Sequence, residues 1–114
     1  MSDTRMNPQS LYRIKTAKVS FAVGRPVAGG RFVVFANSRA AKTITPGLET
    51  ASNVDGAKIR RHREELIDLG VLVDDGKGHL RFTSDFDFKS CHLAAAIING
   101  RPSANGFNDW KALV

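Results

Sequence analysis

The chain has 114 residues, 42% of them hydrophobic, which suits one compact domain with a core of its own. Its single cysteine excludes an internal disulfide, and no apolar run approaches the length of a membrane span. The formal net charge is +6 and uneven, because residues 1–63 carry twelve Lys or Arg against three Asp or Glu, whereas residues 64–114 carry five against eight.

The chain begins with a stretch of weak structural signals. Residues 1–9 are polar and aperiodic, and residues 10–15 favour a weak strand or a turn. We therefore expect a flexible N-terminal segment over residues 1–16 and a single compact domain over 17–114. Alternation over residues 18–23 predicts a strand, and the apolar residues 31–36 predict a second strand that pairs with it in antiparallel fashion.

A long connection leads to the main helix. Residues 37–53 contain Pro46-Gly47, which breaks regular structure, and a short helix over residues 38–42 is one option within them. Residues 55–69 then have helical periodicity, ending at Gly70, which favours the left-handed conformation of a helix end. The apolar face expected for this helix consists of Ile59, His62, Leu66 and Leu69, with Ile67 beside it.

The second half predicts a hairpin and a short helix. Short strands at 71–73 and 80–83 flank a Gly-rich turn. Ser90 is a good N-cap for an Ala-rich helix over 90–99, which Gly100 ends. The fold class is therefore α+β, with a small antiparallel sheet of four to five strands packed against two helices. A winged helix is an alternative, although only one convincing helix precedes the hairpin where three are needed.

The C-terminal part carries a motif that resembles a known family. An aromatic strand is followed by a serine, three alanines, Gly-Arg, Ser-Ala-Asn-Gly, an aromatic residue and Trp-Lys. In this chain the motif consists of Phe88, Ser90, Ala94-Ala95-Ala96, Gly100-Arg101, Ser103-Ala104-Asn105-Gly106, Phe107 and Trp110-Lys111. The pattern is similar to the domain of unknown function 4357 family over about residues 17 to 111.

That family is similar in turn to the domain associated with restriction enzymes and adenine methylases. The resemblance implies an accessory role near such enzymes. This chain departs from the family pattern at Cys91-His92, at Phe107 and at Pro102, which lengthens the loop before Asn105 by one residue. The resemblance therefore bears on the fold more than on any ligand contact.

Basic residues supply the candidate binding site. Lys58 and Arg61 are three residues apart on one helix face, and Arg60 and Arg63 repeat this spacing on a neighbouring face. Such faces can follow phosphates, although a solvated helix surface explains them equally well. The candidate nucleic-acid-binding residues are Arg39, Lys42, Lys58, Arg60, Arg61, Arg63, Arg101 and Asn105. Asn105 can contact a base edge, as Asn does with adenine, or simply occupy a left-handed turn position before Gly106.

The sequence carries no recognisable catalytic or metal-binding pattern. One Cys and three scattered His give no zinc spacing, and Cys91 and His92 diverge by about 100° on a helix, so they form no dyad. No phosphate-binding glycine loop or nucleophile elbow is present. We expect no enzymatic activity, no metal and no cofactor.

Two classes of function stay open from the sequence. The first is a non-catalytic nucleic-acid-binding module, with DNA as the expected ligand, that senses modified DNA in a restriction-modification or defence context. The second is a module that docks on a nuclease or methylase subunit, with a winged-helix regulator as a third option. We expect a cytoplasmic protein without membrane contact, and the sequence does not indicate its oligomeric state.

Overall fold

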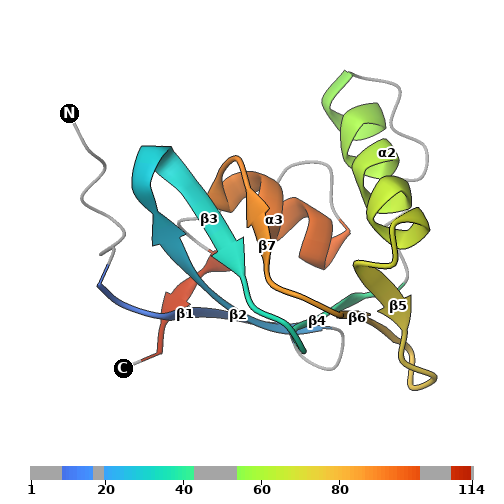
Figure 1. Cartoon of the computed structure of the whole chain (residues 1–114), viewed down its shortest axis with the longest axis horizontal. Helices are drawn as coiled ribbons and strands as arrows, with labels where there is room; N and C mark the ends of the chain where they lie inside the picture. The colour runs from blue at the N-terminus through green and yellow to red at the C-terminus, as the bar shows by residue number, and fades with distance from the viewer. Residues whose placement is uncertain (1–8, 17–19, 43–53, 101–108, 114) are drawn as a thin grey trace.

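The computed structural model describes residues 9–16, 20–42, 54–100 and 109–113 (Figure 1). In these ranges the helices are α2 (Val54–Asp68) and α3 (Cys91–Asn99), and a single 3-10 turn is η1 (Ala28–Gly30). The strands there are β1 (Tyr12–Thr16), β2 (Ser20–Val27), β3 (Arg31–Val34), β4 (Arg39–Ala41), β5 (Leu72–Asp74), β6 (His79–Phe82), β7 (Phe86–Phe88) and β8 (Lys111–Ala112). The α+β class with two helices and an antiparallel sheet is confirmed, whereas the predicted four to five strands are too few, because the sheet has eight.

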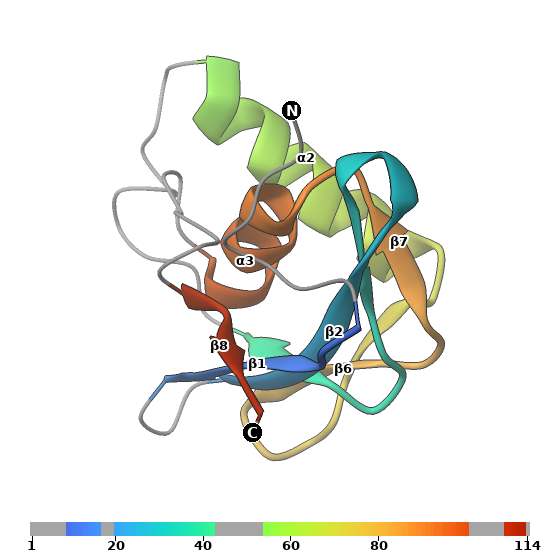
Figure 2. The same ribbon diagram turned by 90° about the vertical axis from the view of Figure 1, so that its left-hand side faces the viewer.

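The sheet branches at β2. One edge of this strand pairs with β1, which in turn pairs with β8. The other edge pairs with β4 at Phe21 and with β3 over residues 24–27. One branch continues through β4, β6 and β5, and the other continues from β3 to β7. The two branches curl around α3, as Figure 2 shows.

Helix α3 lies inside this curl and is the most buried element. The Ser90 hydroxyl accepts from the Leu93 amide at 3.1 Å, and Gly100 adopts the left-handed conformation with φ 67°, so both predicted helix ends are confirmed. Every residue from Ala94 to Asn99 is buried. The small alanine side chains allow the strands to approach this helix closely.

Aromatic residues fill the space between α3 and the strands. Phe32, Phe82 and Phe88 are fully buried. Trp110 is 2% exposed, its ring centroid lies 4.4 Å from that of Phe32, and its indole nitrogen donates to the Cys91 carbonyl at 3.1 Å. Trp110 therefore anchors the segment that leads into β8 to the start of α3.

Several local predictions differ from the structure. Residues 39–41 form β4 rather than part of a helix, and residues 12–16 form β1, so the expected N-terminal segment over 1–16 includes a strand of the sheet. Leu69 is 74% exposed and Ile67 is 44% exposed, so the buried face of α2 excludes both. In the described ranges only α2 precedes the hairpin, and α3 follows it, which is not the helix order of a winged helix.

No helix among the described residues combines the length and the apolar character that crossing a membrane requires.

Candidate nucleic-acid interface

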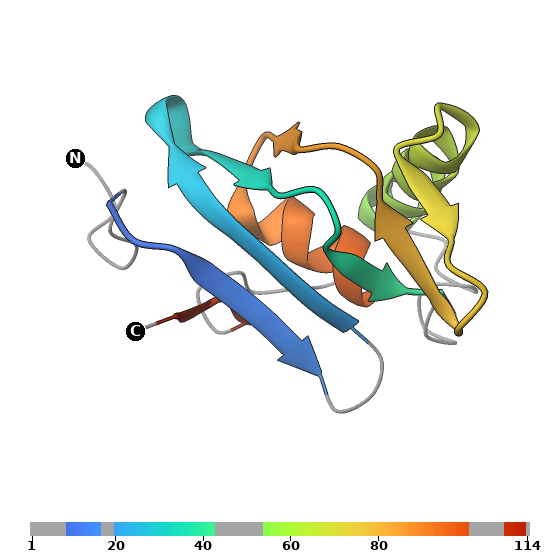
Figure 3. The ribbon, with the colours of Figure 1, turned by 60° about the horizontal axis from the view of Figure 1, so that its bottom comes forward.

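The surface of the sheet that faces away from α3 is the main candidate site, and we call it the outer face. Direct partners in an antiparallel sheet point to the same side, so the strand register identifies its members. One row runs across four strands, from Phe21 to Arg39, Arg81 and Val73. A second runs from Val23 to Arg13 and Lys111. Figure 3 shows β1 and β2 in front of α3, seen from this side.

The outer face places cations directly opposite one another. Arg39 on β4 pairs with Arg81 on β6, and Arg13 on β1 pairs with Lys111 on β8. Like charges at such positions destabilise a sheet, because the Cβ atoms of direct partners lie only about 4.5–5.5 Å apart. Two such pairs on one face indicate a surface that an external anion can stabilise.

Neither row contains an acidic residue in its described positions, and nearby carboxylates have other partners. Asp74 binds Lys42 at 2.6 Å, Asp87 binds Arg31 at 2.9 Å, and Asp85 accepts from the Ala36 amide at 2.8 Å. The guanidinium of Arg81 makes a long contact, 3.4 Å, with the Asn37 side-chain oxygen. The positive charge of the rows is therefore left to solvent or to a ligand.

An aromatic side chain lies beside these cations. Phe21 is 37% exposed and lies on a strand that is paired on both sides. Its backbone partner on β4 is Arg39, so the ring and the guanidinium occupy neighbouring positions of one face. An aromatic ring among cations is the combination that nucleic-acid-binding surfaces use.

The structure separates the candidate residues predicted from sequence into different regions. Arg39 is exposed on the outer face. Lys42 follows β4 and forms an ion pair with Asp74. The hydrogen bond between them raises the pKa of Lys42 and lowers the pKa of Asp74. Lys42 is therefore a partly neutralised member of the predicted set.

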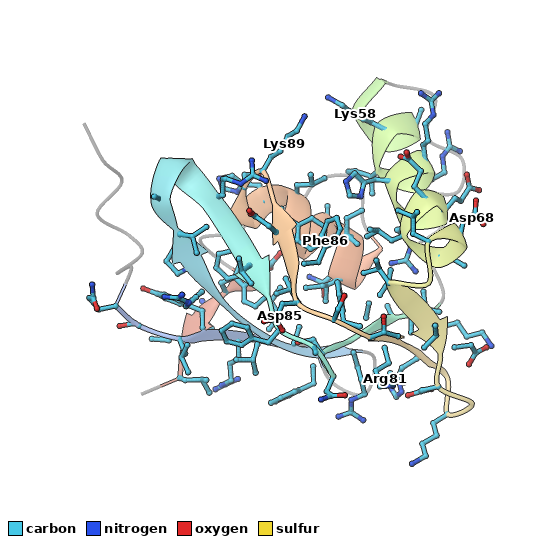
Figure 4. The ribbon with its side chains drawn as sticks, in the orientation of Figure 1. Lys58, Asp68, Arg81, Asp85, Phe86 and Lys89 are labelled. Carbon is cyan, nitrogen blue, oxygen red and sulfur yellow. The ribbon has the colours of Figure 1, made fainter. Side chains whose placement is uncertain are left out.

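The predicted cluster on α2 lies on the other side of the molecule. Lys58 and Arg61 are exposed and Arg60 is half-buried. Figure 4 shows Lys58 at the top of α2 and Arg81 projecting below the sheet. Among its described side chains, the same helix also exposes the acidic residues Glu64, Glu65 and Asp68. The charge of the α2 surface is thus nearly balanced, unlike that of the outer face.

Arg63 is not a surface residue, which corrects its place in the predicted cluster. It is 4% exposed, and its guanidinium donates to the carbonyls of Ile97, of Ala41 (2.6 Å) and of Lys42 (3.4 Å). Burial lowers its pKa. The Ile97 carbonyl belongs to the last turn of α3, where a cation also complements the helix dipole. Arg63 therefore joins α2 to α3 and β4 and is unavailable to a phosphate.

Arg101 and Asn105 lie outside the described residues, so their predicted contacts with nucleic acid remain predictions.

Comparison with known proteins identifies the family. The family model described as a domain of unknown function (DUF4357) matches residues 12–113. The chain belongs to the DUF4357 family. No curated protein and no solved structure matches the chain. Membership in DUF4357 agrees with the resemblance drawn from the C-terminal motif, and the match begins at Tyr12, the first residue of β1.

His62 of this DUF4357 domain packs against aromatic rings. Its ring centroid lies 5.8 Å from that of Phe88 and 6.2 Å from that of Phe86. Burial lowers its pKa. The predicted place of His62 on the apolar face of its helix agrees with these contacts.

Metal binding has no candidate cluster in the described part of this DUF4357 domain, where no group of three or more His, Cys, Asp or Glu side chains is placed to hold an ion. Asp85 accepts from the backbone amide of Ala36, and Asp87 contacts Arg31. The expected absence of a cofactor and of catalytic activity stays a prediction.

Sequence reasoning missed four residues of the outer face: Arg13, Phe21, Arg81 and Lys111. Alternation showed that Phe21 and Ala22 lie on opposite faces of a strand, but alternation alone does not say which face is buried. A usable signal was the size of the alternating residues, because Ala22 and Gly24 are both small. Small residues on one face indicate that another element packs closely there.

Proposed function

We propose that this DUF4357 domain is a non-catalytic nucleic-acid-binding module that contacts phosphates through the outer face of its sheet. The observation that supports this most strongly is the direct pairing of Arg39 with Arg81 across β4 and β6. Repulsion within such a pair costs stability in the free protein. A phosphate between the two guanidiniums offsets that repulsion, since arginine binds phosphate with a planar set of donors.

The charge balance of the two basic surfaces supports the sheet over the helix. The two rows of the outer face present Arg13, Arg39, Arg81 and Lys111 without an acidic residue, and Asp87, which belongs to a third row of the same face with Arg25 and Val33, is paired with Arg31. Among the described side chains of α2, exposed or half-buried bases and exposed acids are equal in number. Long-range attraction of a polyanion follows the net charge of a surface. We therefore place the phosphate contacts on the sheet and keep Lys58 and Arg61 as the competing site.

The resemblance to methylase-associated domains extends the proposal to its biological context. In that context the ligand is DNA, the modification state of the DNA affects binding, and the protein acts in the cytoplasm beside a restriction or modification enzyme. Methylated and unmethylated oligonucleotides of one sequence, titrated in parallel, test this part of the proposal. Equal affinities would remove modification sensing and leave general binding in place.

A pair of charge-matched double variants tests the site. We compare Arg39→Gln/Arg81→Gln with Lys58→Gln/Arg61→Gln, because each removes two positive charges from exposed or half-buried positions. Binding of a labelled oligonucleotide at about 50 mM salt, followed by fluorescence anisotropy, gives the affinities. The sheet variant should lose at least about tenfold in affinity, and the helix variant should change much less, because charges beyond a Debye length of about 10 Å at 0.1 M salt contribute little.

Two results would decide against this assignment. A larger loss in the helix variant would move the site to α2. Absence of any binding by the wild-type protein at low salt would remove the nucleic-acid function altogether.

Docking on a partner protein is the second candidate function, and one observation favours it. Ile67 and Leu69 expose apolar side chains at the end of α2, at 44% and 74%. Exposed apolar residues that lie close together favour protein contacts. Binding of a partner protein that persists at high salt and is lost in the Leu69→Ser variant would support docking, because electrostatic binding weakens as salt rises.

A further inference from the structure

We propose that the outer face selects single-stranded over double-stranded nucleic acid, with Phe21 as the residue on which an unpaired base stacks. This inference rests on the proposed function and specifies its ligand. It starts from the position of Phe21, which is 37% exposed on an interior strand and has Arg39 as its direct partner.

The position of Phe21 within the sheet is unsuited to insertion into the major groove of a duplex. The major groove admits an α-helix or a two-stranded ribbon. Phe21 instead lies on β2 with β1 on one side and with β4, followed by β6, on the other. A surface four strands wide is too broad to enter that groove, so an undeformed duplex meets it mainly through its phosphates.

An unpaired strand can use the whole surface. Sheet surfaces bind single strands when an exposed aromatic ring stacks on a base and neighbouring cations hold the flanking phosphates. Arg39 is adjacent to Phe21, and Arg81 is the next position along the same row. One base on Phe21 and one or two phosphates on the arginines fit this row.

The partial exposure of the ring, 37%, matters as well. A side chain that is only partly exposed loses little conformational freedom when a base covers it, so the ring is pre-organised for stacking. Ile67 serves as a reference for ordinary apolar exposure, since it is 44% exposed on α2 but belongs to the balanced helix surface.

Fluorescence of a Phe21→Trp variant tests the stacking directly. The native Trp110 is 2% exposed and buried against Phe32, so a bound strand cannot reach it. We expect an unlabelled single-stranded oligonucleotide of DNA or RNA to quench the emission of the variant and to leave the wild-type emission unchanged. The complementary duplex should not quench either protein. Absence of quenching at saturating single strand would overturn the inference.

Affinity measurements separate this inference from the proposed function. Phe21→Leu keeps an apolar side chain in the sheet and removes the ring, whereas Phe21→Tyr keeps the ring. Phe21→Leu should weaken single-strand binding by at least about fivefold, and Phe21→Tyr should retain it, because stacking on one aromatic ring contributes strongly to affinity. Ile67→Ala is the control and should bind as the wild type does.

The DNA and RNA strands are titrated separately, and tighter binding of either one than of its duplex supports the inference. Equal affinity for single strand and duplex, with no effect of Phe21→Leu, would overturn it while leaving phosphate binding by the arginines intact. Failure of the wild-type protein to bind any of these ligands would overturn both proposals.

Discussion

Arg39 and Arg81 face one another across β4 and β6 and have no carboxylate between them in the described rows. In such a pair, the repulsion that lowers the stability of the free protein comes from the same charges that are proposed to bind phosphate. Changing Arg81 to Glu places opposite charges at the two positions, which should raise stability by a few tenths of a kcal/mol up to about 1 kcal/mol. The same change removes one of the proposed phosphate contacts and should weaken nucleic-acid binding.

Thermal unfolding and anisotropy on the same preparation check this prediction. Arg61→Glu on α2 is the matched control, because it makes the same charge change at an exposed position outside the outer face. If Arg81→Glu is less stable than the wild type, repulsion between the two arginines is not a feature of the free protein.

Arg63, unlike Arg39, is buried and binds groups within the protein. All its described acceptors are backbone carbonyls, from Ile97, Ala41 and Lys42. Arg63→Met keeps much of the apolar stem but leaves buried carbonyls without a donor, at a cost of about 1–3 kcal/mol for each unsatisfied group. We expect urea unfolding to show a loss of about 2 kcal/mol or more for Arg63→Met.

Arg63→Lys should recover only part of this stability, because an ammonium lacks the planar fork that reaches separate acceptors. Arg61→Met is the control, since this exposed position lies two residues earlier on the same helix and should stay within about 0.5 kcal/mol of the wild type. Equal effects at the two positions would mean that the buried contacts of Arg63 do not stabilise the fold.

At the scale of elements, the close approach of β2 and β3 depends on Gly24. A Cβ atom at this position would lie 2.3 Å from the Val33 carbonyl oxygen and 2.6 Å from the Phe32 ring. Gly24→Ala should therefore separate the two strands and cost about 1–3 kcal/mol, as overpacking does elsewhere. Chemical denaturation gives the free energy of unfolding, and Arg25→Ala, at the exposed next position, serves as the control. Unchanged stability in Gly24→Ala would show that the strands can move apart at no cost.

The elements differ in how well sequence patterns predicted them. Helix α3 was found with both ends, because Ser90 and Gly100 have local reasons to cap a helix. Strand β4 was missed, since three residues between loops carry too little periodicity, and its position depends on pairing with β2 and β6. Tertiary contacts of this kind have no local signal in the chain.

The candidate site was only partly accessible from sequence for a related reason. A run of basic residues on one helix is visible in the chain, which is how Lys58 and Arg61 were selected. The rows of the outer face join residues that are distant in sequence, such as Arg13 and Lys111 or Arg39 and Arg81. Helical periodicity also assigned Arg63 to a binding face, because the pattern cannot show that α3 and β4 offer buried carbonyls at that position.

At the scale of the whole molecule, the fold redistributes the charge of the chain. The basic first half supplies Arg13 and Arg39 to the outer face, and the acidic second half still contributes Arg81 and Lys111 to the same surface. The acidic residues Glu64, Glu65 and Asp68 lie on α2, on the other side of the sheet. The fold therefore gathers cations from both halves of the chain on one surface, which the separation of charge along the chain does not show.

This arrangement predicts the salt dependence of binding. Each neutralised phosphate releases counterions, so log K falls linearly with log salt, with a slope of about −0.7 per contact for single strands and about −0.9 for duplex DNA. With the four outer-face cations engaged, the slope should be about −2.8 for a single strand, so the affinity falls about 50-fold between 50 and 200 mM salt.

Two variants separate phosphate contacts from stacking. Arg39→Gln/Arg81→Gln should reduce the slope to about −1.4. Phe21→Leu should lower the affinity at every salt concentration and leave the slope unchanged, because stacking releases no counterions. Anisotropy titrations at four or more salt concentrations measure both quantities. A slope near zero for the wild-type protein would contradict phosphate binding by this face, and a change of slope in Phe21→Leu would mean that the ring positions the arginines instead of stacking on a base.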